Sequence, residues 1–169
     1  GSRLMNPSMI DRSSAPRRIL MYTAYFAPEF SGAALQALTL ARELRLRGHH
    51  VEFVTNRWPG LPSFAIVDGF PLRRLQPGRM RKHREFRLWF NMARFVWQRR
   101  RDFDILHSHG AYFTNAFVAP LAHWLGLKSV IKASLAQDDM QDFDQPRVGA
   151  WHKAMLRQAD ACVAISADL

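Results

Sequence analysis

Residues 18–34 read RILMYTAYFAPEFSGAA, and this stretch decides the fold. Residues 19–23 form a short apolar run of the length of a buried β-strand, and a loop with Pro28, Ser31 and Gly32 follows. From Ala33 onward the apolar residues take helical spacing, so the stretch predicts a strand, a loop and a helix. Ligands of open α/β sheets bind at the carboxyl ends of the strands, which makes this loop a candidate site.

The loop residues Ser31, Gly32 and Ala33 favour an anionic or sugar ligand. Glycine adopts backbone angles closed to other residues and lets a ligand approach the main chain. The free N–H groups at a helix start attract an anion. A turn that only joins a strand to a helix also uses serine and glycine. The stretch by itself therefore leaves a phosphate or sugar site and a structural turn as equal alternatives.

Outward from this stretch, strands and helices alternate along the chain. The first helix is expected to end at Gly48, and residues 50–55 predict a second, parallel strand. Asp68 and Gly69 are a hairpin turn signal between residues 65–67 and 70–75, which predicts an edge strand pair. The periodicity predicts further strands within 102–110, 128–132 and 161–165, and helices over 82–101, 113–124 and 147–158. The predicted fold is α/β: a Rossmann-like, doubly wound, mostly parallel sheet with helices on both faces.

Length and composition fit one domain. The 169 residues are 48% hydrophobic, and no apolar run reaches the roughly 18–20 residues of a membrane-spanning helix. Residues 1–17 are polar, unpatterned and open with Gly-Ser, typical of a tag remnant and a disordered tail, so the domain is expected over 18–169. Cys162 is the only cysteine and is expected to be a buried thiol in a reducing cytosol.

All of the excess charge lies in one part of the sequence. The chain has a formal net charge of +10, and residues 73–101 hold eleven Lys or Arg against the single acid Glu85. Such a block indicates an anionic partner.

The helix predicted over 82–101 has two apolar stripes. We expect the broad one to pack in the core; it comprises Phe86, Trp89, Phe90, Ala93, Val96 and Trp97. The second stripe fits a membrane interface, another domain or a neighbouring helix. Our hypothesis is the membrane interface, since each nearby Lys or Arg gains about 1 kcal/mol at an anionic lipid surface. The residues assigned to that surface are Leu88, Met92 and Phe95 with Arg79, Arg81, Lys82, Arg84 and Arg87.

A polar cluster ends the strand predicted within 102–110. His109 falls at the carboxyl edge of the sheet, near the Gly32 loop if the sheet is doubly wound, whereas His107 is expected in the core. A neutral imidazole at this edge can bind a sugar hydroxyl or a phosphate, although a purely structural histidine is the commoner case. The loop after the next strand is acidic, with Asp138, Asp139, Asp142 and Asp144. It lacks a regular ligand spacing, so we expect a solvated loop and no metal site.

Four segments in this order resemble a known family: FAPEFSGAA, ELRLRGHHVEFVT, DILHSHG and ADACVAIS. Together they look like the N-terminal half of a GT-B fold glycosyltransferase of family 4, the retaining, nucleotide-sugar-dependent kind. The resemblance implies two Rossmann-like domains across a cleft, with the acceptor held mainly by this half. The donor-binding half, absent from this sequence, would hold most of the nucleotide-sugar. It also implies that no metal or other cofactor is needed.

The resemblance carries over residue by residue. His109 corresponds to a histidine beside the donor sugar and is the catalytic candidate. Ser31, Gly32 and Ala33 correspond to the glycine-rich loop, with one glycine where many relatives have two. Where many relatives have a histidine near a glycine, this chain departs from the pattern; the donor- or acceptor-binding candidates there are Lys132, Ser134, Asp138 and Asp139.

The implied reaction transfers a sugar to a glycan or lipid-linked acceptor in surface polysaccharide or glycoconjugate synthesis. The implied location is cytoplasmic, peripheral on the inner face of the membrane, and the 169-residue chain alone is expected to be inactive.

Two alternatives stay open. A basic, non-enzymatic α/β module binding nucleic acid fits the charge, but the helix aromatics are expected to face the core and no nucleic-acid motif is present. A sugar-nucleotide epimerase of the same two-domain architecture is the other.

Overall fold

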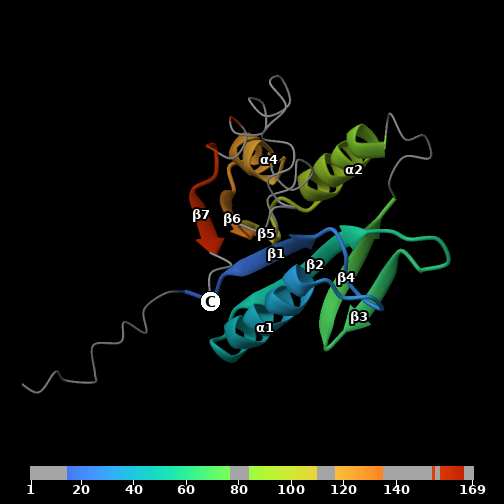
Figure 1. Cartoon of the computed structure of the whole chain (residues 1–169). Coiled ribbons are helices and arrows are strands. Elements are labelled where there is room, and N and C mark those ends of the chain that lie inside the picture. The colour runs from blue at the N-terminus through green and yellow to red at the C-terminus, as the bar shows by residue number, and fades with distance from the viewer. Residues whose placement is uncertain (1–14, 77–83, 110–116, 135–153, 155–156, 166–169) are drawn as a thin grey trace, which may run out of the picture.

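The structure is a computed structural model of the chain, and it describes residues 15–76, 84–109, 117–134, 154 and 157–165 (Figure 1). Within this part, one sheet has the strand order β3-β4-β2-β1-β5-β6-β7. Every neighbouring pair is parallel except β3 and β4, which are antiparallel. The strands are β1 (Arg18–Thr23), β2 (His50–Asn56), β3 (Phe64–Val67), β4 (Phe70–Leu75), β5 (Ile105–His109), β6 (Lys128–Ser134) and β7 (Ala161–Ile165).

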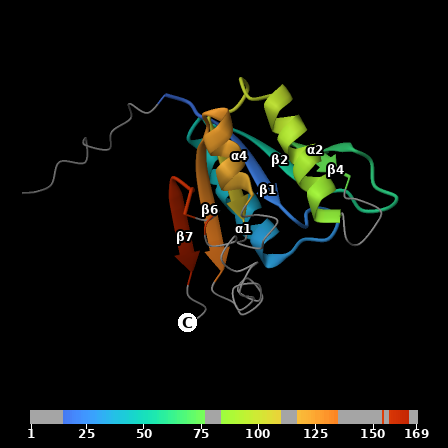
Figure 2. The same cartoon turned by 90° about the horizontal axis from the view of Figure 1, so that it is seen from above.

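Helices cover both faces of this sheet. Helix α1 (Gly32–Leu46) lies on one face, and α2 (Arg84–Gln98) and α4 (Val118–Leu125) lie on the other (Figures 1 and 2). Strand β1 alternates accordingly: Met21 packs with the alanines of α1, whereas Leu20 and Tyr22 pack with residues of α2 and α4. The predicted α/β fold with a doubly wound, mostly parallel sheet is confirmed.

The winding direction of the chain reverses at β1. One crossover, through α1, leads from β1 to β2, and the later strand β5 pairs with the opposite side of β1. A doubly wound sheet binds ligands outside the carboxyl ends of the strands at such a switch point. The ends of β1 and β5, at Thr23 and His109, therefore define the place where a site is expected.

The turns that the sequence predicts are present. The side chain of Ser31 caps α1, because the Ala34 N–H donates to its Oγ at 3.2 Å. Gly48, with φ of +90°, follows the end of α1. The hairpin between β3 and β4 turns at Asp68 and Gly69, both in the left-handed region that this turn requires.

The face assignment of α2 is wrong in part: Val96 packs in the core as expected, whereas Trp97, also expected there, is 51% exposed. Leu88 and Met92, expected at a membrane, are 4% exposed and pack in the core together with Val96, with Phe95 partly buried against them. Phe86 and Phe90, expected in the core, are 63% and 66% exposed. Apolar residues surround most of this helix, so its periodicity does not say which stripe faces the sheet. The aliphatic stripe packs there because α4 and Phe117 close in on the same space.

Several predicted features lie outside the described residues. They are the acidic loop with Asp138 and Asp139, most of the helix predicted over 147–158, and the basic residues Arg79, Arg81 and Lys82. The side chains of Arg84 and Ser134 also lie outside the description. In the part of the chain that is described, no helix is long and apolar enough to cross a bilayer.

Candidate functional site

His109 ends β5 at the switch point and is 2% exposed. The register pairs His107 with Met21 of β1 and His109 with Lys132 of β6. Paired residues in a sheet point to the same face, and Met21 packs against α1. Both histidines therefore face the α1 side, and α1 begins at the Ser31–Ala33 loop that leaves the carboxyl end of β1. The register therefore places His109 beside Lys132, on the face of the sheet that α1 covers.

The two imidazoles stack, with ring centroids 4.3 Å apart. Burial, together with smaller contributions from the neighbouring His107 and Lys132, lowers the pKa of His109 to about 3. Burial and Lys132 also lower the pKa of His107 to about 4. Both rings are therefore neutral at physiological pH. A neutral imidazole offers one donor and one acceptor nitrogen, which suits a sugar hydroxyl better than a salt-bridged phosphate.

Gly32 does not need the backbone freedom that the sequence analysis assigned to it. It is the first residue of α1, it has no left-handed φ, and a Cβ built on it meets nothing within 4 Å. The open space beside its Cα is compatible with a ligand close to the main chain. The expectation about unusual backbone angles is wrong, and the expectation of ligand approach stays a prediction.

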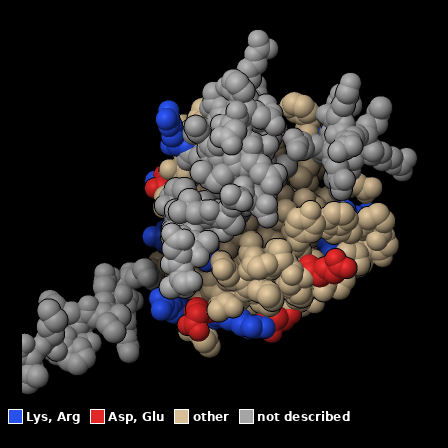
Figure 3. All heavy atoms as spheres, in the orientation of Figure 1, with Lys and Arg blue, Asp and Glu red and all other residues tan. Residues whose placement is uncertain are grey.

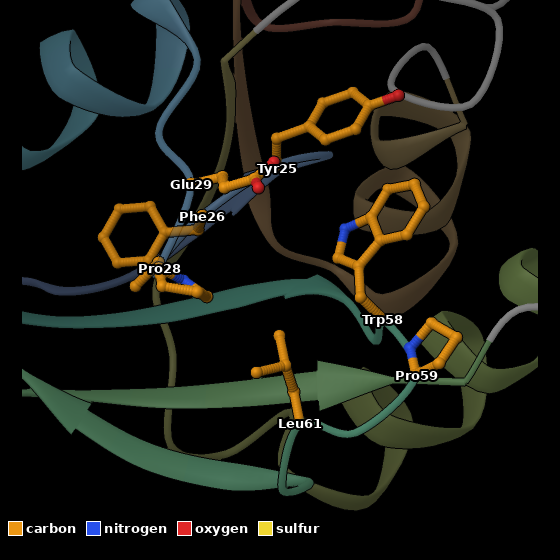
Figure 4. Close-up of a pocket in the computed structure, with 8 residues that line it drawn as sticks. Tyr25, Phe26, Pro28, Glu29, Trp58, Pro59 and Leu61 are labelled. Carbon is orange, nitrogen blue, oxygen red and sulfur yellow. The ribbon is translucent and has the colours of Figure 1, made fainter.

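An aromatic pocket at the carboxyl ends of β1 and β2 is absent from the sequence prediction. It has a volume of about 310 Å³, at the lower end of the range for small-molecule sites. In Figure 4, Tyr25 and Trp58 lie on one side, Phe26 and Pro28 lie opposite, and Leu61 closes the bottom. We call this the aromatic pocket; its lining is Tyr25, Phe26, Ala27, Pro28, Glu29, Trp58, Pro59 and Leu61.

Stacked rings shape the aromatic pocket. Tyr25 and Trp58 are nearly parallel, with centroids 5.4 Å apart, and Phe26 stacks on the buried Phe53 at 4.5 Å. Aromatic faces carry partial negative charge and attract the C–H groups of a sugar ring. Glu29 adds a carboxylate that can accept hydrogen bonds from hydroxyl groups. Such a surface can stack on the apolar face of a carbohydrate ring, and the carboxylate can bind one of its hydroxyl groups.

Arg74 ties together the two loops that form this pocket. Its guanidinium donates to the carbonyl oxygens of Ala27, in the β1–α1 loop, and of Pro62, in the β2–β3 loop, each at 3.1 Å. The side chain lies beneath both loops, with the residue 6% exposed. The planar guanidinium is a rigid, forked donor, so one side chain links the two loops. The sequence signal for this pocket was the pair of aromatic runs YFAPEF and RWPG directly after two strands.

The other predicted residues lie apart from this edge. Arg87 is exposed on α2, and Leu88 and Met92 lie in the core beneath that helix. On the face shown in Figure 3, Lys or Arg and Asp or Glu lie side by side along α1, so the charge there is mixed. The described basic residues of the 73–101 block belong to β4, to α2 and to the turn that follows α2.

Comparison with known proteins agrees with this geometry. Residues 31–169 match the family model of the glycosyl transferase 4-like domain. Acinetobacter baumannii MurG superposes with a TM-score of 0.56 at 15% identity, over 89% of this chain and 45% of MurG. Os79 from O. sativa, solved in complex with UDP and deoxynivalenol-3-glucoside, gives 0.54 at 13% identity, over 88% and 46%. No curated protein sequence matches the chain.

The two solved structures share the fold with this chain, which spans a little under half of their length. The family match covers most of the chain and includes the start of α1, His109 and Lys132. The fold is that of the N-terminal half of a GT-B glycosyltransferase, and the chain belongs to the family of glycosyl transferase 4-like domains.

Proposed function

We propose that the chain is the acceptor-binding half of a retaining, nucleotide-sugar-dependent glycosyltransferase. The observation that carries the proposal is the aromatic pocket at the carboxyl edge of the sheet, beside the strand that ends in the neutral His109. A GT-B enzyme binds its substrates in the cleft between its two halves, and the carboxyl edge is the side of an open sheet that takes ligands.

In this proposal the aromatic pocket holds the acceptor sugar. Tyr25 is about half exposed and is stacked on Trp58, so the two rings offer a rigid apolar platform without further ordering. Glu29 accepts a hydrogen bond from an acceptor hydroxyl. The acceptor is a glycan or lipid-linked glycan of surface polysaccharide or glycoconjugate synthesis.

The donor sugar lies next to His109 in the same proposal. Its neutral ring binds a donor hydroxyl, and the N–H groups at Gly32 and Ala33 face the diphosphate at the start of α1. Ser31 serves as the helix cap, which leaves its backbone as the binding group. Lys132 adds positive charge beside His109. Ser134, Asp138 and Asp139, which follow on the chain, are proposed to contact substrate from the end of β6.

The proposed transfer keeps the anomeric configuration. The bond from the anomeric carbon to the diphosphate oxygen breaks, the acceptor oxygen bonds to that carbon on the same face, and the acceptor proton passes to the departing diphosphate. Backbone N–H groups and basic side chains of the donor-binding half would stabilise the leaving group, without a metal ion.

A transfer assay tests this proposal. The protein to assay is the joined enzyme, in which this chain is linked to a donor-binding half. It should release a nucleoside diphosphate from at least one of a panel of nucleotide sugars. His109→Gln should lower that turnover about 100-fold, since the ring contacts the sugar in the transition state. The 169-residue chain alone should be inactive. Turnover by the chain alone, or unchanged turnover in His109→Gln, would contradict the proposal.

We also propose that the enzyme works on the cytoplasmic face of a membrane. The support is the outward face of α2, where Phe86, Phe90 and Trp97 are exposed and the exposed Arg87 lies on the same helix. Aromatic and basic residues on one helix face suit an anionic bilayer interface. These aromatic residues replace Leu88 and Met92, which are buried.

A further inference from the structure

A second concave surface lies between β4 and α2 and shares the β2–β3 loop with the aromatic pocket. Trp58, Pro59 and Leu61 of that loop line the pocket, whereas Arg57 and Ser63 line this groove. The groove has a volume of about 480 Å³, and no carboxylate is among the described residues that line it. We call it the arginine groove, after the five arginines in its lining: Arg57, Arg73, Arg74, Arg94 and Arg99.

Only one of these five charges is neutralised within the described chain. Arg99 forms ion pairs with Glu52 and Asp102. Arg57 donates instead to the Leu61 carbonyl, at 3.0 Å, and to the Gln76 side chain. Arg73 lies over the Phe64 ring, 5.3 Å from its centroid, and Arg94 is exposed on α2. Arg57, Arg73 and Arg94 therefore line one concavity without a carboxylate partner in the described residues.

Arg74, which also lines the groove, adds a buried charge beneath the neighbouring loops. The residue is 6% exposed, and its two hydrogen bonds go to neutral carbonyl groups. Its Nε is buried and has no hydrogen-bond partner within the described part of the chain. A buried charge without a counter-ion is unfavourable, and an anion held nearby would offset that cost. Among the described residues, the charged side chains that line the groove are all positive, as the binding of such an anion requires.

We propose that the arginine groove binds a phosphate or diphosphate group and that this group belongs to the sugar acceptor. Guanidinium groups are planar, forked donors that bind phosphate oxygens in pairs, and here they converge from β4, α2 and the β2–β3 loop. The shared loop places the groove directly beside the aromatic pocket, so one phosphorylated glycan reaches both. The assignment to the acceptor rests on the proposed function, whereas the anion site itself does not.

A titration of the 169-residue chain with inorganic pyrophosphate tests the site. Isothermal titration calorimetry should show saturable binding of one pyrophosphate. Arg73→Gln and Arg94→Gln should each weaken it about tenfold, the effect of losing a charge-assisted hydrogen bond. Neither residue has an ion pair within the described residues, so both variants should fold. Arg47→Gln is the matched control, because it removes the same charge from the exposed end of α1 and should leave the affinity unchanged.

Three results would overturn the anion site: no pyrophosphate binding at millimolar concentration, equal weakening by Arg47→Gln, or tighter binding of a single-stranded oligonucleotide through the same arginines. Vesicles of phosphatidylcholine with phosphatidylglycerol separate the two sources of phosphate. If the groove variants weaken pyrophosphate binding but not vesicle binding, the acceptor assignment is supported. If they weaken vesicle binding equally, the group is a lipid headgroup and the acceptor assignment is overturned.

The two proposals fail separately. Sugar transfer by the joined protein without pyrophosphate binding would overturn the arginine groove and leave the proposed function in place. Pyrophosphate binding without sugar transfer would overturn the proposed function and leave the arginine groove in place.

Discussion

At the scale of single residues, the neutral pair His107 and His109 makes the fold sensitive to acid. The unfolded chain protonates both rings near pH 6.5, whereas the folded chain holds their pKa values at about 4 and about 3. Between these limits the unfolded state binds more protons, so the free energy of unfolding falls as the pH falls. In this range each ring lowers the free energy of unfolding by about 1.4 kcal/mol for every unit by which the pH falls.

Urea unfolding at pH 7.5 and at pH 5 measures this effect. At pH 5, which is about 1.5 units below the unfolded pKa, we expect the two histidines together to lower the free energy of unfolding by about 4 kcal/mol relative to pH 7.5. His107→Gln and His109→Gln should each reduce the pH dependence by about half. His123→Gln, at an exposed position on α4, should not change it. An unaltered dependence in both His107→Gln and His109→Gln would contradict the neutral pair.

A substitution at Gly32 distinguishes a structural role of this loop from a role in ligand binding. Its helical backbone and the open space at its Cβ position predict that Gly32→Val changes the free energy of unfolding by less than about 1 kcal/mol. Gly48→Val, at φ of +90°, should cost about 1–2 kcal/mol and shows that the assay detects backbone strain. If a ligand approaches the main chain at Gly32, Gly32→Val should abolish transfer in the joined enzyme. Full transfer would return the loop to a purely structural role.

At the scale of elements, α2 shows where periodicity stops being sufficient. A helix with apolar residues at 86, 88, 89, 90, 92, 95, 96 and 97 has two candidate faces. The face that packs is decided by its neighbours, here α4 and Phe117, and no local pattern encodes them. The hairpin at Asp68 and Gly69 and the cap at Ser31 were predictable, because their residues act through their own backbone.

The two faces of α2 should respond differently to truncation. Leu88→Ala removes a buried side chain and should destabilise the fold by about 2–5 kcal/mol. Phe90→Ala removes an exposed ring and should leave stability within about 0.5 kcal/mol. Chemical denaturation measures both values. Equal losses would contradict the orientation of α2.

The same exposed ring tests the membrane proposal. Phe90→Ala combined with Trp97→Ala should weaken sedimentation of the chain with anionic vesicles by more than tenfold, because both rings lie on the outward face of α2. Trp124→Ala, which removes an exposed ring from α4, is the control. Equal effects of the double variant and the control would argue against docking through α2.

At the scale of the molecule, the sheet was predictable because each strand carries its own apolar run and each turn its own signal. The switch point at which a site is expected also followed, since its place depends only on the order of strands and helices. The aromatic pocket did not follow. Tyr25 and Trp58 are separated by a helix and a strand in sequence, and only the parallel pairing of β1 with β2 brings their loops together.

Sugar transfer by the joined enzyme tests the central claim most directly, through the Michaelis constants for acceptor and donor. Trp58→Ala removes one wall of the aromatic pocket and should raise the KM for the acceptor at least tenfold, with the KM for the nucleotide-sugar unchanged. Trp124→Ala should change neither value. A rise in the donor KM alone, or an unchanged acceptor KM in Trp58→Ala, would contradict the account of this chain as the acceptor-binding half.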